Sequence, residues 1–488
     1  MTSRRKLALL LALSLAGCDG REPEVPGSDW REMLARGDGL GAEVALRREL
    51  DAGAQREALA PFFGEAELLQ GDLIAASSWL DLAPFTPDVA AQGFRMIGRL
   101  KMREGELRVA GQAFDRALAL RPADPEVWAD IGRLRWQGGE QAQAIEASKK
   151  ALALGPANPQ AILLRAQLIR DAQGNAAALP LLERGLTSAP EHTELLGEYA
   201  ATLGELGRAK DMLAAVRKLP AGPRGLYLQA VLAARGGKYD TARDLLQRSG
   251  DLHRQLPAAV LLLALIDLES GNVESAAQGL ERLLRRQPDN RRARLLLARA
   301  LAMGGNHREL IGRFGQDTAS PYLATLVGRA HEALGERQKA APYLDRASSA
   351  RLASLERLAP STAVDVAQGR GTSNGSSVVA LVRGLIAQDR AGEARAKAQA
   401  FLEAHPGSGD AMALAGDAAI AARDLGGGLA LYRKAAAIRR PWSLTKRIVA
   451  ALDLLGRPGE GTALIKAHLA GEPGNAEAFA WLRVRSTG

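Results

Sequence analysis

Apolar residues recur along this chain at helical rather than strand spacing. Between Phe94 and Asp124, apolar and small side chains fall three, four and seven residues apart, and Gly105 interrupts the pattern. This spacing predicts a first helix over about 94–103, a tight turn at the glycine, and a second helix over about 107–120. Aromatic residues make up only 4% of the chain, and much of its apolar content is Ala and Leu, which favour helices. We therefore expect an all-α protein.

The helical pattern repeats every 34 residues. Pro122, Pro156 and Pro190 share this spacing, and glycines and alanines at other positions of the unit share it as well. Several columns with one period indicate structural repeats that bury their apolar faces against their neighbours. Fainter copies of the unit extend the count to roughly eleven antiparallel helix pairs. A terminal helix over about 475–485 follows them, and the stacked pairs are expected to form a curved solenoid.

The order of small and bulky positions in the unit resembles that of the tetratricopeptide repeat (TPR). From Phe94 to Pro156, a bulky residue, a small residue, a turn glycine, an alanine and a closing proline follow one another twice. The resemblance implies a TPR-type α-solenoid whose concave inner face is lined by the first helix of each pair. It also implies a function in protein binding.

The repeats divide into two blocks. We expect one TPR array over 30–350 and a C-terminal TPR block with its terminal helix over 378–488. Between them, residues 351–377 are rich in Gly, Ser and Thr towards their end, and 359–377 carry no helical period. This composition predicts a loop or hinge.

Residues 1–17 are predicted to be an export signal. Three basic residues at 4–6 precede an apolar run over 7–17, which suits a signal peptide but is shorter than the roughly 20 residues of a membrane span. The sequence LAGC at 15–18 resembles the lipobox of bacterial lipoproteins, and Cys18 is the only cysteine of the chain. The resemblance implies cleavage before Cys18, lipid on that residue, and a tether that extends to residue 29.

A lipidated Cys18 predicts a periplasmic protein that is anchored to a membrane. Asp19 resembles the inner-membrane retention signal of enteric lipoproteins, which favours the inner membrane and leaves the outer membrane as the alternative. Three of the 64 Lys and Arg residues leave with the signal peptide, so the mature chain is only mildly basic. We expect no nucleic-acid partner in this compartment, whereas anionic polysaccharide and anionic lipid headgroups stay open as partners.

Inward positions of the first helices predict a partner-binding strip. Helical spacing places these residues on one face of three successive repeats: Arg95, Arg99, Arg133, Trp136 and Arg170. Because arginine binds carboxylates through two parallel hydrogen bonds and tryptophan offers a flat apolar surface, the strip is a candidate for binding an acidic, extended peptide. The alternative is a solvated basic face with Trp136 packed against the next helix.

A second basic cluster spans a repeat boundary. It contains Arg285, Arg286, Arg291, Arg292 and Arg294. One hypothesis is a contact site for an acidic polymer or lipid headgroups, and the other is an ordinary charged surface.

Patterns that are typical of catalysis are not found. The six histidines do not pair at metal-ligand spacing, and repeat packing accounts for His331. The glycine-rich stretch at 369–375 lacks the Lys-Ser/Thr of a phosphate-binding loop. We expect no metal, no cofactor and no enzymatic activity.

Leader and repeats together favour a lipid-anchored scaffold that binds proteins of the bacterial cell envelope, for example during assembly of a secretion complex. The combination resembles the TPR lipoproteins that accompany exopolysaccharide export and PEP-CTERM protein sorting, which implies a partner in such machinery. The alternatives are a polysaccharide-binding module of an export complex and a non-catalytic accessory of an envelope enzyme.

Overall fold

Helices form the regular secondary structure throughout the described part of the chain. The computed structural model describes residues 29–81, 84–219, 222–250, 254, 256–316, 320–348 and 375–486. Within these residues there are 27 helices and no strand. Twenty-six of them form thirteen consecutive pairs joined by short turns, and α29 follows alone. The prediction of an all-α solenoid is confirmed, with two pairs more than the eleven expected.

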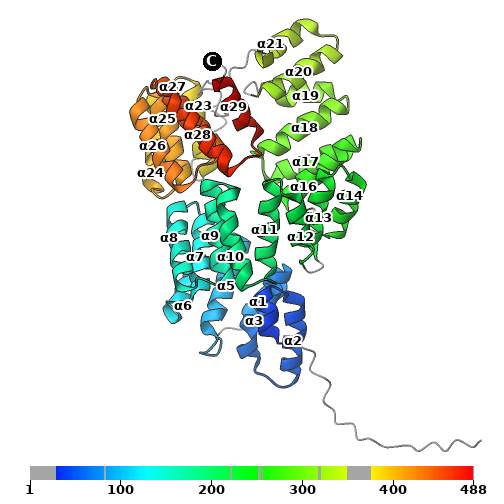
Figure 1. The fold of residues 1–488 in the computed structure, drawn as a ribbon, viewed down its shortest axis with the longest axis vertical. Helices are drawn as coiled ribbons and strands as arrows, with labels where there is room; N and C mark the ends of the chain where they lie inside the picture. Colours follow the sequence, from blue (N-terminus) through cyan, green and yellow to red (C-terminus); the bar gives the residue numbers. More distant parts are fainter. Residues whose placement is uncertain are drawn as a thin grey trace, which may run out of the picture.

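The first five pairs form the lower half of the molecule in Figure 1. They are α1 (Trp30–Arg36), α2 (Gly39–Asp51), α3 (Arg56–Gln70), α4 (Leu73–Leu80), α5 (Ala90–Glu104), α6 (Leu107–Leu120), α7 (Pro125–Gln137), α8 (Gln141–Leu154), α9 (Pro159–Gln173) and α10 (Asn175–Ser188). The predicted helix over 107–120 coincides with α6, whereas α5 begins four residues before the predicted start at 94.

The next five pairs continue the array upward in the same view. They are α11 (Thr193–Glu205), α12 (Ala209–Val216), α13 (Pro223–Arg235), α14 (Tyr239–Arg248), α16 (Pro257–Glu269), α17 (Val273–Arg286), α18 (Arg291–Met303), α19 (His307–Phe314), α20 (Pro321–Ala333) and α21 (Arg337–Ser348).

The C-terminal block holds three pairs and the terminal helix. They are α23 (Gly375–Ala387), α24 (Ala391–Ala404), α25 (Gly409–Ala421), α26 (Leu425–Ile438), α27 (Trp442–Leu454), α28 (Pro458–Gly471) and α29 (Ala476–Ser486). Because α23 begins at Gly375, the last three residues of the loop predicted over 351–377 are helical. The rest of that loop, the signal peptide, Cys18 and the tether up to residue 28 lie outside the described residues.

The sequence explains how one pair is built. Asp124 accepts hydrogen bonds from the first backbone amides of α7, and Pro125 occupies its first position, where no amide donor is needed. Gly105 ends α5 with a φ of 85°, a left-handed conformation that favours glycine. Gly98 lets α6 approach closely, since a Cβ there would lie 2.4 Å from the buried ring of Phe114.

The array is wound tightly enough for distant pairs to meet. Thr193 at the start of α11 donates a hydrogen bond of 2.8 Å to the carbonyl of Arg36 at the end of α1. Farther along the chain, the C-terminal block lies beside α8–α10 (Figure 1), and the turn before α25 contacts the start of α8. No described helix is both long and apolar enough to cross a bilayer.

Candidate functional site

The predicted inner strip is assembled on α5, α7 and α9, but its arginines already face carboxylates. Arg95 is only 3% exposed, and its Nε donates a 2.8 Å hydrogen bond to Asp130 on the next repeat. Its Nη1 also pairs with Glu126. Arg133 donates to the second oxygen of Asp130 at 2.9 Å. Asp130 therefore joins two arginines from neighbouring repeats.

The remaining members of the strip are occupied in similar ways. Arg170 pairs with Glu198 on α11, and Arg99 lies 3.9 Å from a carboxylate oxygen of Glu65 on α3. Trp136 packs against an apolar cluster that includes Leu164 of the following repeat. This packing is the alternative that the sequence left open for the tryptophan.

Protonation equilibria reflect the burial of this network. Burial disfavours the ionised form of Asp130, but Arg95, Arg99 and Arg133 outweigh it and hold the pKa of Asp130 below its ordinary value. The pKa of Glu194 is lowered in the same way, by Arg133 and Arg99 acting against burial. In contrast, burial raises the pKa of Glu65, although Arg95 and Arg99 lie nearby and act to lower it. The arginines of the inner strip are paired with carboxylates rather than free; Arg95 is buried, and Arg99, Arg133 and Arg170 are half-buried.

An acidic peptide bound there would compete with carboxylates of the chain itself. Removing one partner from a buried ion pair leaves an uncompensated charge, which costs about 3–5 kcal/mol. The arrangement of Arg95, Asp130 and Arg133 therefore joins successive repeats, and the carboxylates that do this are the residues that sequence reasoning missed. A detectable signal was the acidic residue about one repeat length after Arg95.

The second basic cluster gathers at the turn between α17 and α18. Arg285 and Arg286 are exposed in the last turn of α17, and Arg291 and Arg292 are exposed at the start of α18. The guanidinium of Arg294 lies 5.9 Å from the ring centre of Phe314. Arg285 and Arg286 interact favourably with the negative C-terminal end of the α17 dipole. Arg291 and Arg292 lie at the positive N-terminal end of the α18 dipole, which is unfavourable for a cation. Four of the five predicted side chains thus form an exposed basic turn.

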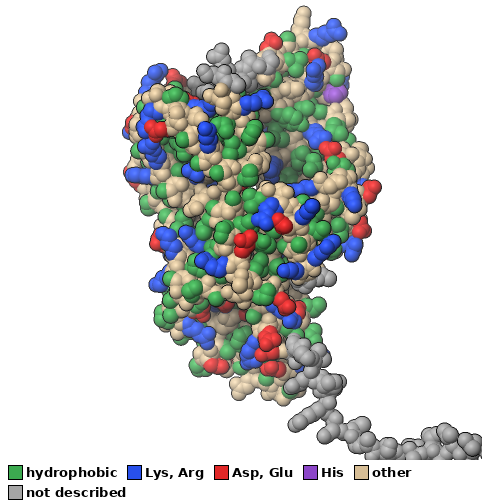
Figure 2. Space-filling view, in the orientation of Figure 1, with side chains coloured by type: hydrophobic (Ala, Val, Ile, Leu, Met, Phe, Trp, Pro, Cys, Tyr) green, Lys and Arg blue, Asp and Glu red, His purple; other side chains and the backbone are tan. Residues whose placement is uncertain are grey.

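An apolar surface that the sequence did not single out lies on the first helices of later repeats. Leu265 of α16 is 37% exposed, and Leu262 is half-buried on the same helical face. On α18, Leu295 and Leu296 are also half-buried. Figure 2 shows hydrophobic side chains over α16–α18, beside a hollow that separates these helices from the C-terminal block. We call Leu262, Leu265, Leu295 and Leu296 the inner apolar face.

One ion pair shows that α16 and α18 present this face on the same side. Glu269, one turn beyond Leu265, accepts a 2.8 Å hydrogen bond from Arg299 of α18. Arg299 lies one turn beyond Leu295 and Leu296 on α18. Charged residues therefore border an apolar area, which is the usual composition of a protein-binding surface.

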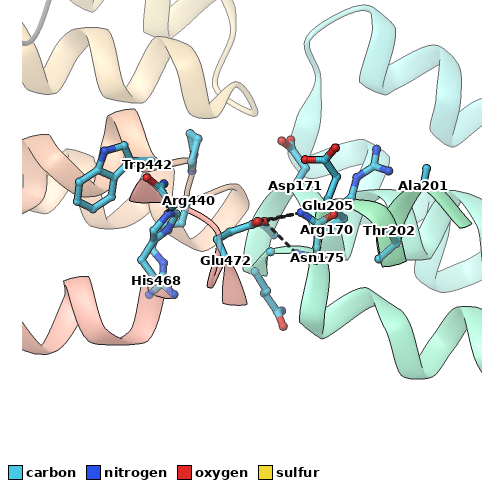
Figure 3. Close-up of a pocket in the computed structure, with 15 residues that line it drawn as sticks. Arg170, Asp171, Asn175, Ala201, Thr202, Glu205, Arg440, Trp442, His468 and Glu472 are labelled. Carbon is cyan, nitrogen blue, oxygen red and sulfur yellow. Dashed lines mark hydrogen bonds between the residues drawn. The ribbon is translucent and has the colours of Figure 1, made fainter. Parts of the chain in front are cut away.

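A separate cleft lies between α9–α11 and α27–α28. It encloses about 400 Å³ and is lined by polar residues of both blocks. Figure 3 shows Glu472 reaching across it towards Asn175, with Trp442 and His468 on the α27–α28 side. Burial lowers the pKa of His468, which favours the neutral form of this ring. The described residues contain no group of three or more side chains that could hold a metal ion.

Comparison with known proteins identifies the repeats. Models of the tetratricopeptide repeat match residues 95–159, 195–254 and 233–300. No curated protein sequence matches the chain significantly.

Three solved structures match parts of the chain at low sequence identity. A tetratricopeptide repeat protein from Parabacteroides merdae is 17% identical over 51% of this chain and 100% of its own, with a TM-score of 0.35. PilF of Pseudomonas aeruginosa is 18% identical over 43% and 96%, with a TM-score of 0.34. The human IFIT1 dimer with PPP-AAAA is 16% identical over 84% and 94%, with a TM-score of 0.40.

Proposed function

This chain contains tetratricopeptide repeats, and from that premise we propose that it is a lipid-anchored scaffold that binds proteins of the bacterial cell envelope. Proteins built from such repeats are typically non-catalytic and bind other proteins. The observation that carries the proposal is the inner apolar face, where Leu265 is exposed beside the half-buried leucines Leu262, Leu295 and Leu296.

The inner apolar face favours one kind of partner. Leu265 is 37% exposed, so a partner that excludes water from it makes the free energy of binding more favourable. Its neighbours on α18 widen the area, while Glu269 and Arg299 form a polar border. These features suit an apolar segment of a protein partner, whose central side chains supply most of the binding energy. The buried ion pairs around Asp130 are less suitable, because a ligand would have to break them.

The leader supports the anchored location. A basic stretch, an apolar run and the LAGC sequence precede Cys18, and several acyl chains on one residue would make attachment durable. Asp19 supports the inner membrane, with the body of the chain in the periplasm. Resemblance to TPR lipoproteins of exopolysaccharide export and PEP-CTERM sorting supports a partner in an export assembly.

One fractionation and capture experiment tests both parts of the proposal. The affinity-tagged full chain is produced in a Gram-negative host, and the membranes are separated before the bound proteins are identified. We expect the wild-type chain in the inner membrane with a specific protein partner. Cys18→Ser should abolish lipid attachment, measured by incorporation of a labelled fatty acid into the chain. Leu265→Glu should stay anchored but lose most of the partner, since it places a charge on the inner apolar face.

The control is Leu120→Glu, which alters an exposed leucine on α6, outside the inner apolar face. It should retain both anchor and partner. A Cys18→Ser chain that still incorporates the labelled fatty acid would contradict the lipid anchor, and equal capture by Leu265→Glu and wild type would contradict the binding surface. Wild-type chain in the outer membrane would overturn only the inner-membrane part.

A further inference from the structure

The C-terminal block touches the first array at helix ends that are 265 to 297 residues away in sequence. The backbone amide of Ala142 in α8 donates to the carbonyl of Gly407 at 3.1 Å. In return, the Gln141 side chain accepts from the amide of Gly409, the first residue of α25, at 2.6 Å. The first turns of α8 and α25 therefore satisfy each other's free amides.

A third helix start is satisfied across the same interface. α10 has Gly174 at its N-cap and no side chain there to accept a hydrogen bond. Glu472 of the opposite block supplies one instead, because its carboxylate accepts from the backbone amide of Asn175 at 2.9 Å and from the Asn175 side chain at 2.8 Å (Figure 3). The negative charge of Glu472 also interacts favourably with the positive N-terminal end of the α10 dipole.

Glycines allow the two backbones to come this close. A Cβ on Gly471 would lie 2.5 Å from the carbonyl oxygen of Gln173, and one on Gly407 would lie 2.1 Å from the side chain of Gln143. At Gly471 the neighbouring atom belongs to the backbone, so even alanine would force the blocks apart there. At Gly407 the neighbouring atoms are the end of the Gln143 side chain, which would have to move aside.

The interface has no shared apolar core among the described residues. The hydrophobic clusters of α7–α10 contain no residue of the C-terminal block, and those of α23–α29 contain no residue of the first array. An ion pair of 3.1 Å between Asp171 and Arg439 adds another polar contact. Polar contacts between domains permit relative movement, whereas a large apolar interface would fix them.

We propose that the C-terminal block is a clasp that docks reversibly on α8–α10 by capping helices across the interface. When docked, the block forms one wall of the hollow that lies beside α16–α18, the helices that carry the inner apolar face (Figure 2). When released, it opens that hollow to an apolar segment of a partner. The docking itself stands on the contacts above, and only the access of the partner rests on the proposed function.

Hydrogen exchange at three amides tests the clasp in the full chain. Ala142, Asn175 and Gly409 lie in first helical turns, and their amides donate across the interface. We expect them to be protected, but to exchange faster than interior amides of α8, since opening the clasp exposes them without unfolding a helix. Gly471→Ala should speed their exchange about tenfold or more and increase the radius of gyration in X-ray scattering.

The matched control is Gly459→Ala in the same helix, α28, where an added Cβ meets nothing within 4 Å. It should leave exchange and radius unchanged. Glu472→Ala should speed exchange most strongly at Asn175, and it keeps the test valid if Gly471→Ala does not fold.

Three results would overturn the clasp. They are unprotected amides in the wild type, exchange as slow as that of interior α8 amides, and unchanged exchange in both Gly471→Ala and Glu472→Ala. If the clasp variants behave as expected but no partner is captured through Leu265, the clasp stands and the proposed function fails. If a partner is captured through Leu265 but exchange is unchanged in both variants, the proposed function stands and the clasp fails.

Discussion

At the scale of single residues, the ion pairs that the arginines form determine the role of the inner strip. The sequence predicted that Arg95, Arg99, Arg133 and Arg170 share an inner face, and the structure places Arg95 and Arg133 on either side of Asp130. The carboxylate partners of Arg95, Arg99 and Arg170 lie on neighbouring repeats, so helical spacing alone could not assign them. Arg133, in contrast, pairs with Asp130 three residues earlier on the same helix. The direction of a long arginine side chain depends on how neighbouring repeats are rotated against each other.

Asp130→Asn should destabilise the protein strongly. Asp130 is only 2% exposed and joins Arg95 to Arg133, so its loss leaves buried positive charge without full compensation. We expect the free energy of unfolding to fall by about 3 kcal/mol, measured by urea denaturation at pH 7. Glu146→Gln removes the partner of Lys149 in an exposed ion pair and should change stability by less than about 0.5 kcal/mol. Equal effects of the two variants would contradict a structural role for Asp130.

The wild type and Asp130→Asn also give a pH test. The pKa of Asp130 is lowered on folding from an ordinary value of 3.8. A lowered pKa contributes stability that is complete above the unfolded value and is lost as the pH falls through the folded value. The difference between wild type and Asp130→Asn should therefore be constant above about pH 5 and shrink below about pH 4. A constant difference down to about pH 2 would contradict the pairing.

At the scale of helices, the repeat pattern predicted most of what the structure shows. The match at 107–120 follows from apolar spacing, and Gly105 ends α5 as expected. The pattern could not predict the inner apolar face. The helix α16 is apolar at nearly every position from 257 to 268, so periodicity does not distinguish its buried side from its accessible side. Only the curvature of the stacked pairs does so.

Two glycines on facing helices test how a pair is packed. Gly98→Ala places a methyl group 2.4 Å from the Phe114 ring and should lower the free energy of unfolding by about 1–3 kcal/mol. Gly111→Ala on α6 meets Leu134 at an ordinary 3.6 Å and should be neutral or stabilise by up to about 1 kcal/mol through helix propensity. Urea denaturation of both variants measures the contrast. If Gly98→Ala were as stable as Gly111→Ala, α5 and α6 could move apart without lowering the free energy of unfolding, which would contradict the close packing at Gly98.

At the scale of the whole molecule, the sequence predicted two blocks but not their contact. Docking of the C-terminal block on α8–α10 joins residues such as Gln141 and Gly409 that no repeat period relates. Gly471 is the last residue of α28 and is not among the described glycines with a positive φ, so the local backbone does not require glycine there. Its close approach to Gln173 depends on a segment nearly 300 residues away and has no local signal.

The proposed partner-binding surface and the proposed clasp both involve the hollow beside α16. In the docked state the hollow has helices α16–α18 on one side and the C-terminal block on the other (Figure 2). A partner that binds there must reach Leu265, which is exposed, rather than the arginines of the inner strip, which are paired with carboxylates. We therefore propose that a protein partner contacts the inner apolar face of the solenoid.

Photo-crosslinking in intact cells tests that claim most directly. A photoreactive phenylalanine derivative replaces Leu265 in the full-length, membrane-anchored chain, and the same replacement at Leu120 on α6 serves as the control. We predict a discrete crosslinked protein partner from position 265 and none of that size from position 120. Crosslinking to the same partner from position 120 but not from position 265 would contradict the account.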